Sequence, residues 1–249
     1  MSQKLRQEEI LRILAQRGYC TVRYLTDALH YSSATVNRDL NAMQTLGLVK
    51  RTYGGVEAVD RKRYLPLALR QNYMKKEKRR VAEAAAALIE DGDTIYLDAS
   101  TTVQYIAPFL ASKKDIRVVT NNMHLAIELA EYDMEVICLG GKLVERPHML
   151  GGDITTENAL CFHPNKMFFS VDPITADGKV STGGYYLLLY RMMLKNAQKS
   201  YLLTSKSKLT DHMEESLCDF GALTGVIADF DFPDEVKALY PETEFICAT

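Results

Sequence analysis

Apolar and polar positions alternate at helical spacing over the first fifty residues. A first helix is expected over residues 8–14, before Gly18 ends the apolar run. Thr21 and Ser32 can cap a second and a third helix, because each hydroxyl can accept a hydrogen bond from an early backbone N–H group. The apolar positions of the three helices are Ile10, Leu11, Ile13 and Leu14, then Val22, Leu25, Ala28 and Leu29, then Val36, Leu40, Met43 and Leu46.

The third predicted helix leaves Ser33, Asn37 and Arg38 pointing away from its apolar face. Short polar side chains allow a helix to approach the major groove of DNA, where Asn and Arg can form paired hydrogen bonds with base edges. This face therefore predicts a recognition helix for duplex DNA. A helical hairpin used for protein contacts is the alternative interpretation.

A short hairpin is expected directly after this helix. Leu48 and Val49 begin a strand, Lys50 and Arg51 can contact phosphates, and the pair Gly54-Gly55 is expected to make the turn of a wing. The alternative of a simple helical hairpin leaves this glycine pair unexplained. Residues 1–59 are therefore predicted to form a winged helix-turn-helix DNA-binding domain.

The distribution of charge supports that prediction. The chain has a formal net charge of -2, but residues up to Arg80 carry 17 Lys and Arg against 7 Asp and Glu. The remainder carries 13 basic and 25 acidic residues. Attraction to phosphates depends on local charge, so binding to operator DNA is expected in the N-terminal part alone. Residues 60–75, which are basic with one proline, are predicted to be a linker, either solvated or adding phosphate contacts.

Beyond Gly92 the pattern changes to short β-rich runs that alternate with amphipathic helices. Such alternation predicts an α/β domain with a largely parallel sheet, here over residues 76–249 and opening with a helix over residues 76–90. The expected strands are residues 94–97, 117–120, 135–139, 166–171, 200–204 and 223–228.

The first three predicted strands end in small polar loops, "LDASTT", "VVTNN" and "CLGGK". Loops at the carboxyl ends of parallel strands lie together and commonly bind ligands, and hydroxyls and backbone amides at helix starts favour anions. Residues of these loops are therefore expected to hold a phosphate: Ser100, Thr101, Thr102, Thr120, Asn121, Asn122, Gly140, Gly141 and Lys142. Asp98 would repel a phosphate and is expected to bind a ligand hydroxyl instead. Ordinary helix caps and an ordinary glycine turn would explain each loop taken singly.

Other functional classes find little support in the 249 residues, of which 47% are hydrophobic and 25% charged. The five cysteines and five histidines are scattered, so buried free thiols are expected, with no disulfide framework, metal site or cofactor. The polar N-terminus lacks the apolar core of a signal peptide, and no apolar run is long enough to cross a bilayer. The protein is expected to be cytoplasmic, without a membrane partner.

The N-terminal part resembles a known family. The run "SSATVNRDL" followed by "VKRTYGG" resembles the DeoR family of bacterial sugar-operon repressors, whose pattern is S-x-x-T-[IV]-R-R-D-L and then L-x-R-x-x-G-G. The resemblance and the exposed face together predict DNA contacts by Ser32, Ser33, Thr35, Asn37, Arg38, Lys50, Arg51, Gly54 and Gly55. Asn37 departs from the pattern, which has an arginine there. Asp39 is expected to hold the helix in place by pairing with a basic neighbour.

The resemblance extends over nearly the whole chain. Sensor domains of the DeoR family are similar to the sugar-phosphate isomerase fold, and their motifs match the three polar loops, the segment with Gly151 and Gly152, and Lys208 in "LTSKSKL". These residues are therefore added to the predicted effector site, although a solvated loop would equally explain Lys208. The chain departs from the family at Ser170, Pro173, Tyr185 and Tyr186, which predicts a smaller and less polar opposite wall.

The resemblance implies a transcriptional repressor whose affinity for operator DNA changes when a phosphorylated sugar or related metabolite binds. A homodimer or homotetramer is expected, because bacterial operators commonly repeat their half-sites. Two alternatives stay open. One is a sugar-phosphate isomerase or deaminase, with Asp98 as the only evident base; the other is a repressor that has lost its ligand and responds to a partner protein.

Overall fold

The computed structural model describes residues 3–45, 48–58, 67–132, 134–144, 148–182, 186–211, 213 and 215–249. The chain folds as two units, Met1–Tyr73 and Met74–Thr249. Two positions with expected roles, Leu46 and Tyr185, lie outside the described residues.

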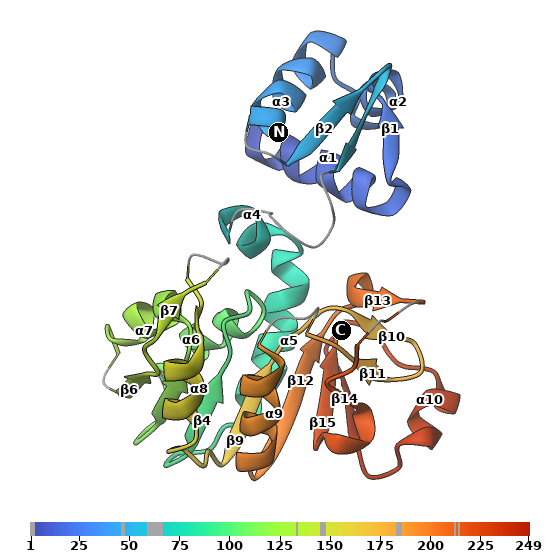
Figure 1. Ribbon diagram of the computed structural model, residues 1–249. Coiled ribbons are helices and arrows are strands. Elements are labelled where there is room, and N and C mark those ends of the chain that lie inside the picture. Colours follow the sequence, from blue (N-terminus) through green and yellow to red (C-terminus); the bar gives the residue numbers. More distant parts are fainter. Residues whose placement is uncertain are drawn as a thin grey trace. The chain divides into compact units, whose positions relative to one another are not determined.

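The first unit contains three helices, a three-stranded antiparallel sheet and a short final helix (Figure 1). In chain order these are α1 (Gln3–Arg17), β1 (Tyr19–Thr21), α2 (Val22–Leu29), α3 (Ser33–Thr45), β2 (Val49–Thr52), β3 (Gly55–Ala58) and α4 (Leu67–Asn72). The sheet has the order β1-β3-β2. Strand β1 was not predicted, and α4 lies within the stretch predicted to be a linker.

The predicted starts of the second and third helices are confirmed, whereas the first helix, expected over residues 8–14, begins earlier and spans Gln3–Arg17. The Thr21 hydroxyl accepts a hydrogen bond from the Tyr24 backbone N–H at 3.1 Å, and the Ser32 hydroxyl accepts one from the Thr35 N–H at 3.2 Å. The predicted apolar faces meet in one core. Its fully buried members are Ile10, Leu14, Leu25, Val36, Leu40, Met43 and Val56.

The second unit is built on a seven-stranded parallel sheet in the order β16-β15-β12-β9-β4-β5-β6. The strands are β4 (Thr94–Leu97), β5 (Arg117–Thr120), β6 (Glu135–Cys138), β9 (Lys166–Phe169), β12 (Lys199–Thr204), β15 (Gly225–Ala228) and β16 (Glu244–Cys247). All six predicted strands are present within two residues of their expected bounds, whereas β16 was not predicted.

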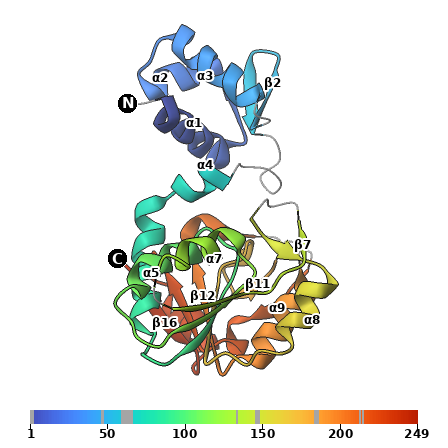
Figure 2. The same ribbon diagram turned by 90° about the vertical axis from the view of Figure 1, so that its left-hand side faces the viewer.

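Helices cover both faces of this sheet (Figures 1 and 2). One face packs against α5 (Lys75–Ala87), η1 (Val103–Ile106), α6 (Ala107–Leu110) and α7 (Met123–Leu129). The other packs against α8 (Asp153–Ala159), α9 (Leu187–Asn196) and η3 (Phe220–Ala222). Successive residues of β4 alternate between the faces, since Ile95 and Leu97 belong to the first core and Tyr96 to the second. The predicted α/β fold with a parallel sheet is confirmed.

Smaller elements complete the second unit. A four-stranded sheet has the order β13-β10-β11-β14, and β7 pairs with β8. These strands are β7 (Lys142–Leu143), β8 (Leu150–Gly151), β10 (Ile174–Thr175), β11 (Lys179–Val180), β13 (Leu209–Thr210) and β14 (Cys218–Asp219). The remaining helices are η2 (Lys206–Lys208) and α10 (Asp234–Leu239).

The strand order places a topological switch point beside β4. The chain runs from β4 to β5 and β6 on one side, then crosses back to β9 on the other side of β4. Connections that leave adjacent strands in opposite directions open a space at the carboxyl edge of the sheet, where ligands bind in open α/β folds. The loops after β4 and β9 therefore mark the position of the candidate site.

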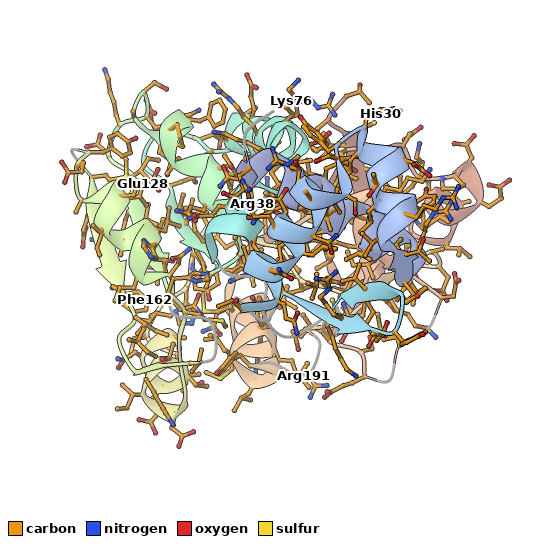
Figure 3. The ribbon with its side chains drawn as sticks, turned by 90° about the horizontal axis from the view of Figure 1, so that it is seen from above. His30, Arg38, Lys76, Glu128, Phe162 and Arg191 are labelled. Carbon is orange, nitrogen blue, oxygen red and sulfur yellow. The ribbon has the colours of Figure 1, made fainter. Side chains whose placement is uncertain are left out.

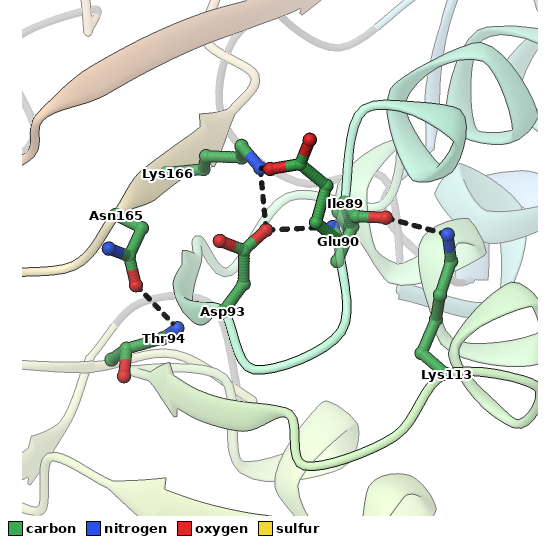
Figure 4. Close-up of polar contacts among 7 residues, drawn as sticks. All are labelled: Ile89, Glu90, Asp93, Thr94, Lys113, Asn165 and Lys166. Carbon is green, nitrogen blue, oxygen red and sulfur yellow. Dashed lines mark hydrogen bonds and ion pairs between the residues drawn. The ribbon is translucent and has the colours of Figure 1, made fainter.

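The amino ends of the same two strands are held by a charged cluster (Figure 4). The Lys166 ammonium lies 2.6 Å from a carboxylate oxygen of Asp93 and 2.9 Å from one of Glu90. Nearby, the Thr94 backbone N–H donates to Asn165 Oδ1 at 2.8 Å, and Lys113 donates to the Ile89 carbonyl at 2.6 Å. These contacts fix the edge of the sheet opposite the candidate site.

Three features of the structure bear on other kinds of site. No described helix is long and apolar enough to cross a membrane. Over the described ranges, no group of His, Cys, Asp or Glu is arranged to hold a metal ion. All five cysteines are free thiols, but the prediction that they are buried holds fully for Cys20 alone, because Cys218 is half-buried and Cys138, Cys161 and Cys247 are exposed.

Candidate DNA interface and effector site

Helix α3 presents the predicted polar face in the first unit. Ser33 and Arg38 are exposed on it, and Figure 3 shows Arg38 on α3. Ser32 and Thr35 are joined by a hydrogen bond between their hydroxyls at 2.9 Å, so both help to cap the start of the helix. The start of α3 is exposed, and this cap satisfies the Thr35 backbone N–H.

Asp39 anchors α3 as expected. Its carboxylate is fully buried and lies 2.6 Å from Arg6 Nε of α1, with a second hydrogen bond from Arg6 Nη2 at 3.2 Å. A carboxylate that is buried and paired with a guanidinium positions the helix and is withdrawn from DNA. The sequence indicated the role but not the partner, which lies 33 residues earlier.

The wing differs from its prediction in the role of one glycine. The turn between β2 and β3 consists of Tyr53 and Gly54, and Gly54 has a φ of +80°, which favours glycine. Gly55 is the first residue of β3, and a Cβ there would collide with the Tyr19 side chain and the Cys20 carbonyl. The second glycine is therefore required by packing of β3 against β1 and not by the turn.

The two basic residues of β2 have different surroundings. Lys50 is 70% exposed and lies 3.5 Å from Glu57 across the hairpin, so it stays a candidate for a phosphate contact. Arg51 instead donates hydrogen bonds to the side-chain oxygens of Asn37 and of Asn41, the latter at 2.6 Å. In the protein without DNA, the Arg51 guanidinium forms hydrogen bonds with α3. Its predicted contact with a phosphate would require these hydrogen bonds to be shared or broken.

In the second unit, the carboxyl edge is organised around Asp98, directly after β4. Asp98 is fully buried, and its carboxylate accepts hydrogen bonds from the backbone N–H groups of Ser100 and Ser170, each at 3.0 Å, and from the Tyr190 hydroxyl at 2.8 Å. Burial raises the pKa of Asp98 above its usual range, although these hydrogen bonds work in the opposite direction. Both oxygens of Asp98 already accept hydrogen bonds from the protein, so this arrangement does not favour a ligand hydroxyl at Asp98, and that contact stays a prediction.

The loop after β5 is likewise held by internal hydrogen bonds. The Thr120 hydroxyl donates to the Leu97 carbonyl at 2.6 Å and accepts from the Asn122 N–H at 3.0 Å. The Asn121 side chain accepts from the Tyr96 hydroxyl at 2.9 Å and donates to the Leu150 carbonyl at 3.1 Å. The side chains of Thr120 and Asn121 therefore position the loop, and their contact with a phosphate stays a prediction.

Asn122 differs from its two neighbours. Its oxygen caps α7 by accepting a hydrogen bond from the Leu125 N–H at 3.1 Å. Its amide nitrogen is buried and has no hydrogen-bond partner among the described residues. Of the three residues in this loop, Asn122 is the one that retains a donor for a ligand.

The glycines predicted to line the effector site lie beside the polar loops. Glycine is required at these positions largely by packing within the protein. A Cβ on Gly141 would collide with the Thr155 hydroxyl, and one on Gly151 would collide with the Tyr186 ring. Gly140 and Gly152 have φ values of +69° and +91°. Packing against Thr155 is by itself enough to require glycine at Gly141, so the contact of Gly141 with a ligand stays a prediction.

The two predicted walls are joined through Ser170. Its hydroxyl donates to the Leu203 carbonyl and accepts a hydrogen bond from the Lys208 ammonium at 2.5 Å, while its N–H binds Asp98. Lys208 is therefore placed at the edge of the site rather than in a solvated loop.

Pro173 is buried, and its carbonyl accepts a hydrogen bond from the Ser181 N–H at 3.0 Å. Lys142 is exposed on β7.

Two further residues belong to this edge and were not predicted. Lys78 of α5 donates from its ammonium to Thr101 Oγ1 at 2.9 Å, and Tyr190 of α9 binds Asp98. Lys78 lies in the basic run "KKEKRR" and Tyr190 in the apolar run "LLLYRMML". Neither residue differs enough from its neighbours in the sequence to be recognised as part of a site. The arrangement brings a cation to buried hydroxyls at a ligand-binding edge. Ser100, Thr101 and Thr102 are each at most 8% exposed.

Comparisons with known proteins agree with this geometry. Residues 6–62 match the model of the DeoR-like helix-turn-helix domain, and residues 74–230 match the model of the DeoR C-terminal sensor domain. The chain belongs to the DeoR family. This membership confirms the predicted class of DNA-binding transcriptional regulator, and it argues against the alternative of an isomerase or deaminase.

Relatives match along the whole chain. The lactose phosphotransferase system repressor of Streptococcus mutans serotype c is 30% identical over 99% of this chain and 100% of its own length. The glycerol-3-phosphate regulon repressor of Haemophilus influenzae is 26% identical over 91% of this chain and 88% of its own length.

Solved structures share the fold at lower identity. eIF2B delta from Chaetomium thermophilum is 16% identical, with a TM-score of 0.50 over 66% of this chain and 60% of that one. A ribose 5-phosphate isomerase from Plasmodium falciparum, also 16% identical, has a TM-score of 0.41 over 55% of this chain and 54% of that one.

Proposed function

We propose that this DeoR-family protein represses a carbohydrate-utilisation operon and that a phosphorylated sugar or related anionic metabolite changes its affinity for the operator. The observation that carries the effector class is the contact of Lys78 with Thr101 beside the switch point of the sheet. A cation held by a hydroxyl at a ligand-binding edge favours an anionic ligand. The names of two relatives, a lactose phosphotransferase system repressor and a glycerol-3-phosphate regulon repressor, support the same class.

The roles within the site follow from which groups retain hydrogen-bonding capacity. We assign the anion to Lys78 and Thr101, with Thr102 and the amide nitrogen of Asn122 as further donors. Lys208 approaches from the side of Ser170. The Thr101 hydroxyl accepts from Lys78, so its own proton is available for an anion oxygen.

Asp98 is proposed to position the site rather than to bind the ligand. It joins the backbone after β4 to the backbone after β9, because Ser100 and Ser170 both donate to it. The carboxylate of Asp98 thereby fixes the position of the Thr101 loop relative to Ser170, the residue that Lys208 contacts. A ligand can change the affinity for DNA only if it binds the two states of the protein differently.

The proposal is tested by titrating the full chain with a panel of pentose and hexose phosphates, each beside its unphosphorylated sugar, using calorimetry. Thr101→Ala removes the hydroxyl and Lys78→Gln removes the charge. Each is expected to weaken binding of the active sugar phosphate by about 1.5–3 kcal/mol, the usual value of a hydrogen bond to a charged group. Release of operator DNA should require correspondingly more of the same compound.

Lys76→Gln is the matched control, because Lys76 is exposed on the same helix. It removes an equal charge and should leave effector binding unchanged. Equal binding by the phosphorylated and unphosphorylated sugars, or wild-type binding by both Thr101→Ala and Lys78→Gln, would refute the anion site. Turnover of a sugar phosphate would instead revive the isomerase alternative.

We also propose a homodimer or homotetramer that acts in the cytoplasm, where operator DNA lies. Repeated half-sites in an operator match the symmetry of such an assembly. Sedimentation of the protein alone and with operator DNA would test this, and a monomer bound to a single half-site would contradict it.

A further inference from the structure

The recognition helix α3 carries a row of polar side chains, and an arginine of the wing forms hydrogen bonds with two of them. Ser33, Asn37 and Asn41 are spaced four residues apart on α3, so they form one stripe along the helix. Arg51 of β2 lies against this stripe and donates to the side-chain oxygens of both asparagines, to that of Asn41 at 2.6 Å. One guanidinium therefore spans two positions of the recognition helix.

The chemistry of arginine decides how the two amides are oriented. A guanidinium has donors and no acceptor, so each asparagine must turn its oxygen toward Arg51 and its nitrogen away. For Asn37 that nitrogen donates back to the Ser33 carbonyl at 2.9 Å and to the Ser33 hydroxyl at 3.2 Å. Both ends of the Asn37 amide are therefore used within the protein.

Asn41 is oriented in the same way but is exposed, so its amide nitrogen faces outward as a donor. An asparagine reads adenine by using its oxygen and its nitrogen together, whereas a guanine edge or a thymine O4 offers only acceptors. Because the Asn41 oxygen already accepts a hydrogen bond from the guanidinium, its amide nitrogen is the group left mainly for a base, which favours the second kind of edge. Arg38, exposed on the same helix, also offers only donors.

We infer that Arg51 is a positioning residue for DNA recognition: it holds Asn41 as a donor that reads an acceptor edge in the major groove and withdraws Asn37 from base reading. The inference does not depend on the effector. Lys50, the neighbour of Arg51 on β2, is exposed and takes the phosphate contact instead.

The test begins with selection of the preferred duplex from a random pool by the full wild-type chain. Asn41→Asp keeps an oxygen for Arg51 and removes the outward donor. It is expected to lower the ratio of binding to the selected duplex over random duplex by roughly tenfold, with the loss confined to one base pair of the site. Arg51→Lys keeps the charge but loses the fork, and it should reduce the same preference while leaving the salt dependence of random-DNA binding unchanged.

Two variants serve as controls. Gln44→Glu makes the same change of charge on α3 as Asn41→Asp and should weaken both duplexes alike. Lys50→Gln should weaken both duplexes alike and reduce the salt slope by about one. Circular dichroism confirms that each variant is folded before its binding is compared.

Several outcomes would overturn the inference. One is a wild-type selection in which adenine, on either strand, is the base whose preference Asn41→Asp removes. Another is an Arg51→Lys protein with the wild-type base preference. A third is an Arg51→Gln protein that loses equal affinity for both duplexes together with about one unit of salt slope, since that behaviour identifies Arg51 as a phosphate contact.

Discussion

The two ends of β4 and β9 are both held by buried carboxylates, but the partners of those carboxylates differ. At the amino end, Asp93 pairs with the Lys166 ammonium, which is 6% exposed. At the carboxyl end, Asp98 accepts hydrogen bonds from uncharged donors, two backbone N–H groups and the Tyr190 hydroxyl. Two lysines of that end, Lys78 and Lys208, donate hydrogen bonds to hydroxyls.

This difference suggests that the two ends of the strands contribute to different properties, one to the stability of the fold and the other to binding of the effector. A cation that is already paired with a carboxylate is neutralised and contributes to the fold, as Lys166 does. A lysine that donates to a neutral hydroxyl is not neutralised by that contact, so its charge can attract an anion. The amino end is therefore expected to govern unfolding, and the carboxyl end is expected to govern effector binding at a smaller cost in stability.

The largest effect is expected from Lys166→Met at the amino end. The variant leaves Asp93 buried without its cation, and removing one partner of a buried pair costs about 3–5 kcal/mol of the free energy of unfolding. Urea unfolding would measure the loss. Lys199→Met is the matched control, because Lys199 is the exposed neighbour of Lys166 across β12 and β9. A loss below about 1 kcal/mol, or equal losses in the two variants, would remove the contrast.

An intermediate effect is expected from Tyr190→Phe at the carboxyl end. Loss of a hydrogen bond to a buried carboxylate should cost about 1.5–3 kcal/mol of unfolding free energy near neutral pH. Urea unfolding at a series of pH values measures it. The Tyr190 hydroxyl binds Asp98 and is not itself assigned to the anion, so effector binding should fall less than in Thr101→Ala.

The pH dependence of this loss identifies Asp98 as its cause. Burial raises the pKa of Asp98, so the folded protein binds that proton more tightly than the unfolded chain does. This group by itself therefore lowers stability as the pH rises through its folded pKa. Because the hydroxyl favours the ionised form, the difference between wild type and Tyr190→Phe should shrink as the pH falls through that pKa. A difference that is independent of pH would show that Tyr190 acts by packing alone.

The smallest effect is expected from Glu90→Gln. Glu90 also contacts Lys166, at 2.9 Å, but its side chain is 81% exposed. An exposed ion pair contributes about 0–1 kcal/mol and is weakened by salt. Thermal unfolding at low and high salt should show a shift at low salt alone. A loss as large as that of Lys166→Met would mean that Glu90, not Asp93, is the partner that matters.

Much of the fold could be predicted because it depends on residues close in the chain. The caps at Thr21 and Ser32 and the starts of β4 and β5 follow from patterns within a few positions. The small sheet of β10, β11, β13 and β14 could not be predicted, since strands of two residues show no alternation. The edge strand β16 was also missed, although its length and burial pattern are the same as those of β6, which was predicted.

The family, the polar loops after the strands and the basic first unit could be recognised before folding, because they depend on motif, composition and local spacing. Which polar groups bind one another depends on the packing of distant segments. Asp98 meets Ser170 and Tyr190 across 72 and 92 residues, and Lys78 meets Thr101 across 23. Arg51 likewise reaches Asn41 only when β2 packs on α3. Such partners depend on which elements pack together, so a loop that has the composition of a binding site can prove to be held by the protein itself.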